Sequence, residues 1–379
     1  MIKVAFVRGK YLNNFEGQNY AFDQHKIKLI GFSSMNALHR DFSFPVMRLA
    51  SISDFLGDVK AVKAIANRAW GDSQVLFGLS KFASQFDIFH TADPHYYYSY
   101  QLAKLRSQNK IKKLLVTSWE TIPHNNETVS TKKKIKQFVL RHADKFLCYT
   151  EKAKQCLIKE GVDGNKIEVI RLGVNLDTFP KKRTISAEEN KGINILLVGR
   201  LVEEKGIIDL YNAVKNIKKQ SLKIKSLSLT IVGDGPLKHR LEKMIKKDSL
   251  TQCVHIIQTT YESIPKVFRE ADIFVLPSKR NKTWEEQYGM VLIEAMATGL
   301  PIVAYDTGAI REVLSEAGSL VKEGDITGLE NEIKSLIESP SLRQKIGTMG
   351  RRRAEKEFDS RKTAKKIEQL YKKLYVSAK

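Results

Sequence analysis

The segment "TWEEQYGMVLIEAMATGLPIVAYDTGAIREVL", Thr283–Leu314, decides the fold because it joins a polar loop to an apolar helix and then to a strand. Glu286 and Glu294 flank a stretch that is otherwise almost wholly apolar. Gly289 interrupts this stretch near its start and Gly299 follows it, which is typical of a short helix. The segment therefore predicts a helix that begins near the carboxyl end of a buried strand.

Short apolar, β-branched runs alternate with longer amphipathic stretches along the whole chain. Near-continuous apolar strands imply burial on both faces, and hence parallel sheets covered by helices. Two runs of this alternation predict two doubly wound, Rossmann-like α/β domains. The expected strands are Ile2–Val7, Ile27–Phe32, Asp87–Thr91, Leu114–Trp119, Lys145–Thr150, Ile167–Leu172, Ile195–Gly199, Leu229–Gly233, Val254–Gln258, Ile273–Pro277 and Ile302–Tyr305.

The length of 379 residues also favours two domains. We expect the first domain over residues 1–178 and the second over residues 193–354. Between them, "FPKKRTISAEENKG" (179–192) is polar, charged and poor in strand signals, so it is the expected linker. The charged tail after the second domain is expected to be helical.

The composition is that of a globular protein with apolar cores, at 42% hydrophobic and 28% charged residues. The net charge of +22 favours anionic partners, although a lysine-rich solubilising surface explains it equally well. The three cysteines are too few and scattered for a disulfide framework, which fits a reducing compartment. No signal-peptide pattern and no membrane-spanning run are read, so a cytoplasmic location is expected, with contact to the inner membrane face as an option.

A basic pair follows the strand that ends at Gly199. Arg200 and Lys205 precede a predicted helix in "LLVGRLVEEKGIIDL". Two cations at a strand's carboxyl end suit a diphosphate, because Arg offers a planar fork and Lys a point charge. The alternative is an ordinary surface pair. The free N–H groups of Met290 and Val291, at the other predicted helix start, can face an anion or sugar hydroxyls.

The two glutamates of the opening segment are candidates for the same ligand. Glu294 can accept two hydrogen bonds from a vicinal diol such as a ribose, and Glu286 lies in the loop before the helix. The alternative for Glu294 is an acid that stabilises its own helix. The segment "IVGDGPL" (Ile231–Leu237) matches a phosphate loop only in part, so a tight strand-to-helix turn is the preferred interpretation.

Polar and aromatic loops also follow strands of the first domain. The loop "RGKYLNNFEGQNYAF" offers Asn14, Glu16 and Gly17 as ligand candidates, with a simple turn as the alternative. Two further loops hold a candidate sugar pocket, for which a core role of the first histidine is the alternative. Its residues are His90, His95, Trp119, Glu120 and His124.

Four motifs together resemble the retaining glycosyltransferases of family four, which have the GT-B fold. They are "VGRLVEEKG", "IVGDGPL", "ADIFVLPS" and "EQYGMVLIEAMATGLPIVAYDTGAIREVL". The match is strongest from about Ala143 to Gly324. The resemblance implies two Rossmann-like domains facing across a cleft, with the tail helix, residues 355–379, crossing back to the first domain.

The resemblance also implies a nucleoside-diphosphate sugar as donor. Arg200 and Lys205 would hold the diphosphate, and Glu286 would bind the transferred sugar; these three are the expected catalytic residues. Glu294 would bind the ribose. The full expected donor set is Gly17, Gly199, Arg200, Lys205, Glu286, Gly289, Met290, Val291 and Glu294.

The acceptor side departs from the family pattern. His90-Thr91-Ala92 stands where the family often shows His-x-His, and Trp119-Glu120 stands where a His-Asp pair is common. The acceptor is therefore expected only as a hydroxyl of a glycan, lipid or small molecule. The acceptor-side candidates are Glu16, His95, Trp119 and Glu120.

No Asp-x-Asp motif is available to hold Mg²⁺, so the basic pair and the helix start at Gly289 are expected to replace a metal. Neither metal nor cofactor is expected. Two rival functions are a GT-B sugar-nucleotide epimerase, which would need further acids and a poised histidine, and a basic nucleic-acid-binding protein, which lacks a recognisable motif here.

The segment "TKKKIKQFVLRHADK" (Thr131–Lys145) is a candidate contact with an anionic membrane surface. A solvated helix face is the alternative. In helical register the apolar residues face inward and three lysines, Lys132, Lys133 and Lys136, face outward.

Overall fold

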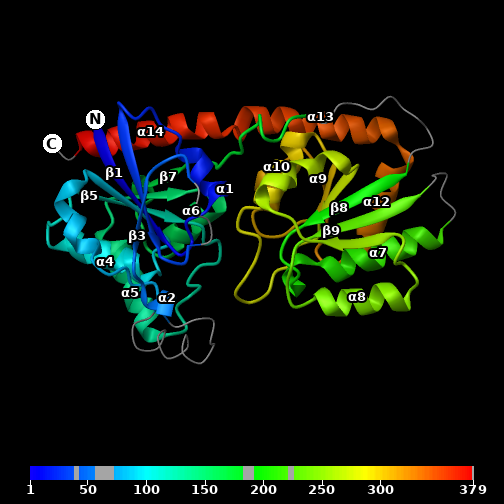
Figure 1. Ribbon diagram of the computed structural model, residues 1–379, viewed down its shortest axis with the longest axis horizontal. Coiled ribbons are helices and arrows are strands. Elements are labelled where there is room, and N and C mark those ends of the chain that lie inside the picture. The colour runs from blue at the N-terminus through cyan, green and yellow to red at the C-terminus, as the bar shows by residue number, and fades with distance from the viewer. Residues whose placement is uncertain (38–41, 56–71, 182–191, 221–225, 378–379) are drawn as a thin grey trace. The chain divides into compact units, whose positions relative to one another are not determined.

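The computed structural model describes residues 1–37, 42–55, 72–181, 192–220 and 226–377. The chain forms two α/β units (Figure 1). The first comprises Met1–Gly173 and Ser360–Lys379, and the second comprises Val174–Asp359.

The first unit contains a seven-stranded parallel sheet of order β3-β2-β1-β4-β5-β6-β7. Its strands are β1 (Ile2–Gly9), β2 (Ile27–Ser34), β3 (Val46–Leu49), β4 (Ile88–Ala92), β5 (Lys113–Ser118), β6 (Lys145–Cys148) and β7 (Ile167–Val169). Its α-helices are α1 (Asn14–Gly17), α2 (Ile52–Phe55), α4 (Tyr97–Ser107), α5 (Ser130–His142), α6 (Glu151–Lys159) and α14 (Ser360–Val376).

Helices cover this sheet on both faces because successive residues of a strand point to opposite sides. Phe89 on β4 packs in the core that contains Tyr98 and Leu102 of α4. The next residue, His90, meets Tyr371 of α14 on the other face. Figure 1 shows α4 and α5 on one side of the strands and α14 on the other.

The second unit contains a six-stranded parallel sheet of order β10-β9-β8-β11-β12-β13. Its strands are β8 (Ile193–Val198), β9 (Leu227–Val232), β10 (Val254–Ile257), β11 (Ile273–Leu276), β12 (Ile302–Tyr305) and β13 (Ser319–Val321). Its α-helices are α7 (Ile207–Lys219), α8 (Lys238–Lys247), α9 (Ile264–Glu270), α10 (Met290–Thr298), α11 (Ile310–Leu314), α12 (Ile326–Glu338) and α13 (Pro340–Glu357).

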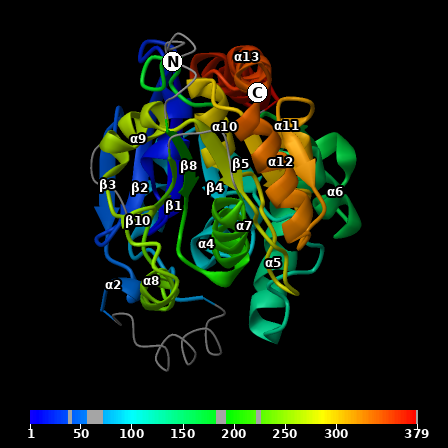
Figure 2. The same cartoon turned by 90° about the vertical axis from the view of Figure 1, so that its right-hand side faces the viewer.

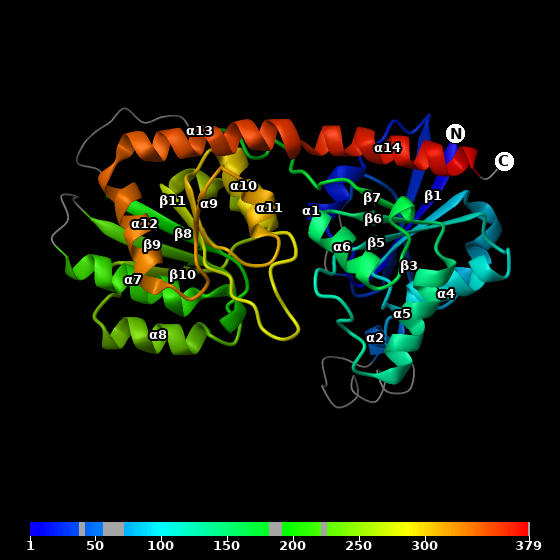
Figure 3. The same ribbon diagram turned by 180° about the vertical axis from the view of Figure 1, so that it is seen from behind.

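Two helix pairs cover the second sheet. Helices α7 and α12 lie side by side on one face (Figure 2), and α10 packs against α13 (Figure 3). Helix α10 is apolar on almost every side and is buried from Leu292 to Thr298, because α9, α11 and α13 all contact it. The polar side chains of this helix are Glu294 and Thr298, and the Thr298 hydroxyl donates to the backbone carbonyl of Glu294.

The strand order reverses once in each sheet. In the first unit the reversal lies between β1 and β4, and in the second it lies between β8 and β11. The loops that leave such a strand pair diverge to opposite faces of the sheet, and ligands of open α/β sheets bind in the crevice between them. These two positions are the places to look for a site in each unit.

All the expected strands are present, and two strands were missed, the edge strands β3 and β13. The units divide at Gly173 and Val174 rather than after residue 178, because the backbone of Val174 pairs with the segment around Asp359. Helix α14 is part of the first unit, whereas residues 355–359 belong to the second. Most of the expected linker lies outside the described residues.

One expected helix face was wrong. Lys136 was expected to face outward from α5, yet its side chain is 2% exposed, and its ammonium group lies 2.5 Å from a carboxylate oxygen of Glu160. Within the described part of the chain, no helix is both long and apolar enough to cross a membrane.

Candidate active site

The loops after β8 and β11 are joined by their backbones at the reversal point of the second sheet. Gly206 has φ of +63°, and a Cβ atom there would lie 1.8 Å from the carbonyl oxygen of Pro277. The N–H of Lys279 donates to the carbonyl of Glu204 at 2.7 Å. Only glycine permits this approach, so the sequence "EEKG" places the side chain of Lys205 directly beside the end of β11.

Lys205 and Glu286 form an ion pair at this point. Their charged atoms are 2.6 Å apart, and the two side chains are 13% and 10% exposed. The hydroxyl of Ser278, which follows β11, donates to the same carboxylate oxygen at 2.8 Å. The ammonium group also lies 5.1 Å from the centre of the Trp284 ring, within the range of a cation–π interaction. The structure thus brings these two predicted residues together.

The backbone of Glu286 is held by the loop after β12. The N–H of Ala309 donates to the carbonyl of Glu286 at 2.8 Å. Gly308 has φ of +59°, and a Cβ atom there would lie 2.2 Å from that carbonyl oxygen. The "TGA" sequence therefore fixes the position of Glu286.

Helix α10 begins at this site without a side-chain cap. Its N-cap residue, Gly289, has φ of +78° and no capping side chain. The first N–H groups of an α-helix have no partner within the helix and carry the positive end of its dipole. Met290 and Val291 supply two of these groups, at the end of β11 and next to Glu286.

Glu294 is buried one turn further along α10, at 3% exposure. The hydroxyl of Tyr261, in the connection between β10 and α9, donates to its carboxylate at 3.2 Å. Burial raises the pKa of Glu294 to about 8, and the Tyr261 hydrogen bond opposes this only in part. The group is therefore a buried acid with a single hydrogen bond from a described side chain, an environment that a ligand diol could complete.

Arg200 differs from Lys205, because its side chain is exposed and makes no ion pair or hydrogen bond with the described residues. It follows Gly199, whose carbonyl would lie 1.9 Å from a Cβ atom at Gly233. A Cβ atom at Gly235 would similarly lie 2.6 Å from the Leu201 carbonyl. The two glycines of "IVGDGPL" thus serve close backbone packing, which confirms the turn interpretation.

In the first unit, a buried ion pair fills the reversal point. The guanidinium of Arg8 bonds the carboxylate of Glu16 at 2.8 to 3.1 Å, and both side chains are 2% exposed. Arg8 also donates to the carbonyls of Val7 and His90, and Tyr149 donates to Glu16 at 2.6 Å. Burial alone would lower the pKa of Arg8, but Glu16 outweighs it and the pKa is raised.

Two acceptor-side candidates bind other groups of the protein. The Glu16 carboxylate accepts hydrogen bonds from Arg8 and Tyr149, and its expected role as a ligand stays a prediction. Both oxygens of Glu120 are also occupied: the N–H groups of residues 121 and 122 bind one, and Asn125 and Asn126 bind the other. Burial raises the pKa of Glu120. We assign Glu120 to the folding of its own loop.

Two candidate histidines of this unit, His90 and His95, are buried, whereas His124 is exposed. The ring of His90 bonds the hydroxyls of Tyr371 and Thr117, each at 2.7 Å, and burial, followed by the charge of Arg8, lowers its pKa well below 6.5. The core interpretation of His90 is correct. His95 is 9% exposed, and burial also lowers its pKa. Gly17 is helical, and its Cα faces the rings of Phe42 and Phe44.

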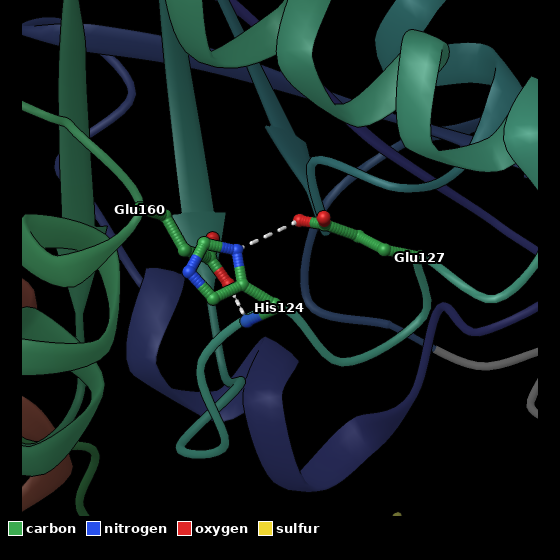
Figure 4. A group of neighbouring side chains, drawn as sticks. All are labelled: His124, Glu127 and Glu160. Carbon is green, nitrogen blue, oxygen red and sulfur yellow. Dashed lines mark hydrogen bonds and ion pairs between the residues drawn. The ribbon is translucent and has the colours of Figure 1, made fainter.

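His124, Glu127 and Glu160 lie together beside α5 (Figure 4), and their ligand atoms are within 4.8 Å of one another. Lys136 already neutralises the two carboxylates of this cluster. The Lys136 ammonium group lies 2.5 Å from Glu160 and 3.3 Å from Glu127. His124 additionally donates its backbone N–H to Glu160. This cluster therefore anchors the loop after β5 to the helices α5 and α6.

Sequence reasoning missed four residues of the two sites: Ser278, Tyr261, Trp284 and Asp93. Ser278 belongs to the quoted "ADIFVLPS" motif and lies two residues after the end of β11, a placement that could have identified it. Tyr261 comes from a separate loop, and no spacing in the sequence links it to Glu294. Asp93 directly follows β4 and lies two residues after the end of the predicted strand Asp87–Thr91, so its position was a usable signal.

Two doubly wound parallel sheets in one chain, with a cation and an acid paired at one reversal point, define the GT-B architecture. Two family models match adjoining parts of the chain. "Glycosyltransferase Family 4" matches residues 56–178, and "Glycosyl transferases group 1" matches residues 178–353. The chain belongs to this family of glycosyltransferases.

Relatives by sequence carry the same description. The chain is 25% identical to an uncharacterized glycosyltransferase of Methanocaldococcus jannaschii over 66% of this chain and 67% of that protein. It is 31% identical to the capsular polysaccharide biosynthesis glycosyltransferase CapM of Staphylococcus aureus over 48% of this chain and 46% of that protein. The matched region thus spans between about half and two thirds of these relatives.

Solved structures share the fold over the whole chain. Sucrose-phosphate synthase from Thermosynechococcus elongatus has a TM-score of 0.73 at 19% identity, with 100% of both chains covered. Anabaena HepE in complex with UDP-glucose has a TM-score of 0.73 at 15% identity, with 98% of this chain and 100% of that chain covered. At these identities the likeness concerns the fold.

The raised pKa of Glu294 gives a prediction for stability. An acid that keeps its proton to about pH 8 when folded, but ionises near 4.5 when unfolded, contributes stability that is lost as the pH rises through this window. As the pH rises from 5 to 8, the free energy of unfolding of the wild type should therefore fall relative to that of E294Q, by up to about 1.4 kcal/mol per pH unit. Above pH 8 the difference should level off.

Urea unfolding of both proteins across pH 5 to 9 measures this difference. The exposed Glu270 supplies a control, because E270Q should follow the wild type at every pH. Parallel pH curves for E294Q and the wild type would show that the folded-state pKa of Glu294 is not raised.

Proposed function

We propose that the protein is a retaining, metal-independent glycosyltransferase that moves a hexosyl group from a nucleoside-diphosphate sugar to a hydroxyl acceptor. The observation that carries the proposal is the Lys205–Glu286 ion pair at the uncapped start of α10, at the reversal point of the second sheet. Family membership supports glycosyl transfer. The HepE structure with UDP-glucose supports a nucleotide sugar as donor for this fold.

In this proposal, three positive groups meet the donor diphosphate. Arg200 is exposed and has its guanidinium available, Lys205 can exchange Glu286 for a phosphate oxygen, and α10 presents its free N–H groups. Negative charge builds on the diphosphate as the anomeric bond breaks, and preorganised positive groups stabilise that charge. Such groups replace the electrostatic work of a metal ion, which is the basis for proposing metal independence.

The two glutamates would bind the ribose and the transferred sugar of the donor. Glu294 would accept hydrogen bonds from the ribose diol, beside Tyr261. Glu286 would orient the transferred sugar, since Ser278 and the loop at Gly308 fix its position. Retention would follow if the leaving phosphate took the proton of the acceptor hydroxyl on the same face of the sugar. The surrounding protein would need to limit hydrolysis by excluding water.

The acceptor is proposed as a glycan, lipid or small-molecule hydroxyl. Contact with an anionic membrane surface stays a prediction that vesicle sedimentation can test. Fewer lysines of α5 are available for this contact than the sequence predicts. Lys136 is buried and Lys132 donates a hydrogen bond to Asn126, whereas Lys133 and Lys134 are exposed.

The basic pair gives the direct test of this function. Nucleoside-diphosphate release from UDP-glucose, UDP-N-acetylglucosamine and GDP-mannose would identify the donor used by the wild type. With that donor, R200A and K205A should each lower turnover by about 10²–10³, because each removes a group that meets leaving-group charge. Turnover near that of the wild type in either folded variant would exclude its residue from this role.

Two controls sharpen the test. R269A and K243A remove exposed charges from α9 and α8 in the same unit and should leave turnover unchanged. Wild-type activity should also persist in EDTA. Loss of activity on chelation, with recovery on adding Mg²⁺ or Mn²⁺, would contradict metal independence.

A further inference from the structure

We propose that Asp93 and Trp119 form a subsite for a sugar ring of the acceptor. Asp93 accepts a hydrogen bond from a ring hydroxyl, and Trp119 covers an apolar face of the ring. The inference rests on the proposed function, because it names the substrate class that this transferase glycosylates. It assigns a saccharide acceptor, and it replaces Glu16 and Glu120, the two acceptor-side acids expected from the sequence, with Asp93.

Asp93 lies at the reversal point of the first sheet, and Trp119 lies at the end of the next strand. Asp93 directly follows β4, and Trp119 directly follows the neighbouring strand β5, which pairs with β4 up to Ala92 and Thr117. Strand order reverses between β1 and β4. The carboxyl ends of the strands at such a point form the ligand crevice of open α/β sheets.

The carboxyl group of Asp93 is fixed at one oxygen and open at the other. The backbone N–H of Trp119 donates to Oδ1 at 2.8 Å. The other oxygen, Oδ2, makes no hydrogen bond with any residue in the described ranges. The residue is partly exposed. A carboxylate in this state is pre-oriented to accept an O–H group from a ligand.

The backbone of Trp119 binds this carboxyl group, and its indole ring is held in place by Tyr149. Its ring meets Tyr149 at a centroid distance of 4.4 Å and an interplanar angle of 69°, an edge-to-face contact that restricts the orientation of the indole. The side chain remains partly exposed. A fixed aromatic surface beside a directed hydrogen-bond acceptor is the combination with which sites bind ligands that have an apolar body and polar edges, such as a sugar ring.

Neighbouring acids lack this freedom. The carboxylates of Glu16 and Glu120 are fully occupied within the protein, as described above. Both still act on Asp93 through their charge, together with Arg8. Burial, opposed by the Trp119 hydrogen bond and reinforced by Glu120, raises the pKa of Asp93 to about 7. Acceptor binding should therefore strengthen as the pH rises through 7 and Asp93 ionises.

Two readouts test the subsite separately from the function. The first is nucleoside-diphosphate release with and without methyl glycosides of glucose, galactose, mannose and N-acetylglucosamine. In D93N and W119A the KM for the stimulating glycoside should rise at least about tenfold. W119F should retain part of the effect, because it keeps an aromatic surface.

The second readout is saturation-transfer NMR of the same glycosides, which needs no turnover. Binding should be seen with the wild type and lost in D93N. The control is D87N: Asp87 directly precedes β4 and also accepts a backbone N–H, that of Lys3, so this change alters the same chemistry at the other end of the strand and should change neither readout.

The outcomes are distinct. A wild type that binds glycosides but releases no diphosphate from any donor would refute the proposed function and keep the subsite. Unchanged glycoside KM and binding in D93N and W119A would overturn the subsite. The subsite would also be overturned if the wild type neither bound nor used any of the glycosides and instead glycosylated a polyprenyl phosphate. The acceptor would then be a lipid.

Discussion

Parallel strands that are buried on both faces leave a protein few places for polar chemistry, and this constraint shapes both units. Along β4, β8, β11 and β12 the side chains are almost all buried, and the strands end in loops that carry charge. At the two order reversals the loops separate, and there the chain places an arginine, a lysine and acids. The same topology thus produces two candidate sites in one molecule.

The two units use this position differently. In the first, Arg8 and Glu16 neutralise each other in a buried ion pair. Further hydrogen bonds to both side chains help to offset the free-energy cost of removing the two charges from water. In the second, Lys205 shares one acid with Ser278 while Arg200 extends into solvent. Positive charge is therefore available for an anion in the second unit and is internally compensated in the first. This difference supports placing the diphosphate of the donor in the second unit.

The sequence predicted most of the second unit because its functional loops depend on local rules. Glycines at positions 206, 289 and 308 are required by left-handed backbone or by close approach, and each stands beside a candidate residue in the motifs. The edge strands β3 and β13 were missed because they span four and three residues, too few to show a strand pattern in the sequence. The strand order places β8 beside β11 in the second sheet. The predicted residues Lys205 and Glu286 follow these two strands, and this explains why they meet at the reversal point.

The first unit was predicted less well, for a physical reason. Whether a carboxylate binds a ligand or a neighbour depends on contacts far apart in sequence, such as those of Glu16 with Tyr149. The acids at positions 16 and 120 were expected to be free and are occupied, whereas Asp93 was overlooked. Likewise Lys136 lies on a polar stretch that reads as solvated, yet two acids from other segments surround it.

The central claim is that a nucleoside diphosphate binds in the second unit with its ribose at Glu294 and its diphosphate beside Lys205. Titration calorimetry with UDP, GDP and ADP, on the wild type, E294A and E286Q, tests it most directly. The account predicts that one nucleotide binds the wild type, that E294A weakens this binding by about 1–3 kcal/mol because the ribose hydroxyls lose their partner, and that E286Q leaves it nearly intact. Equal losses in both variants, or no loss in either, would contradict the claim.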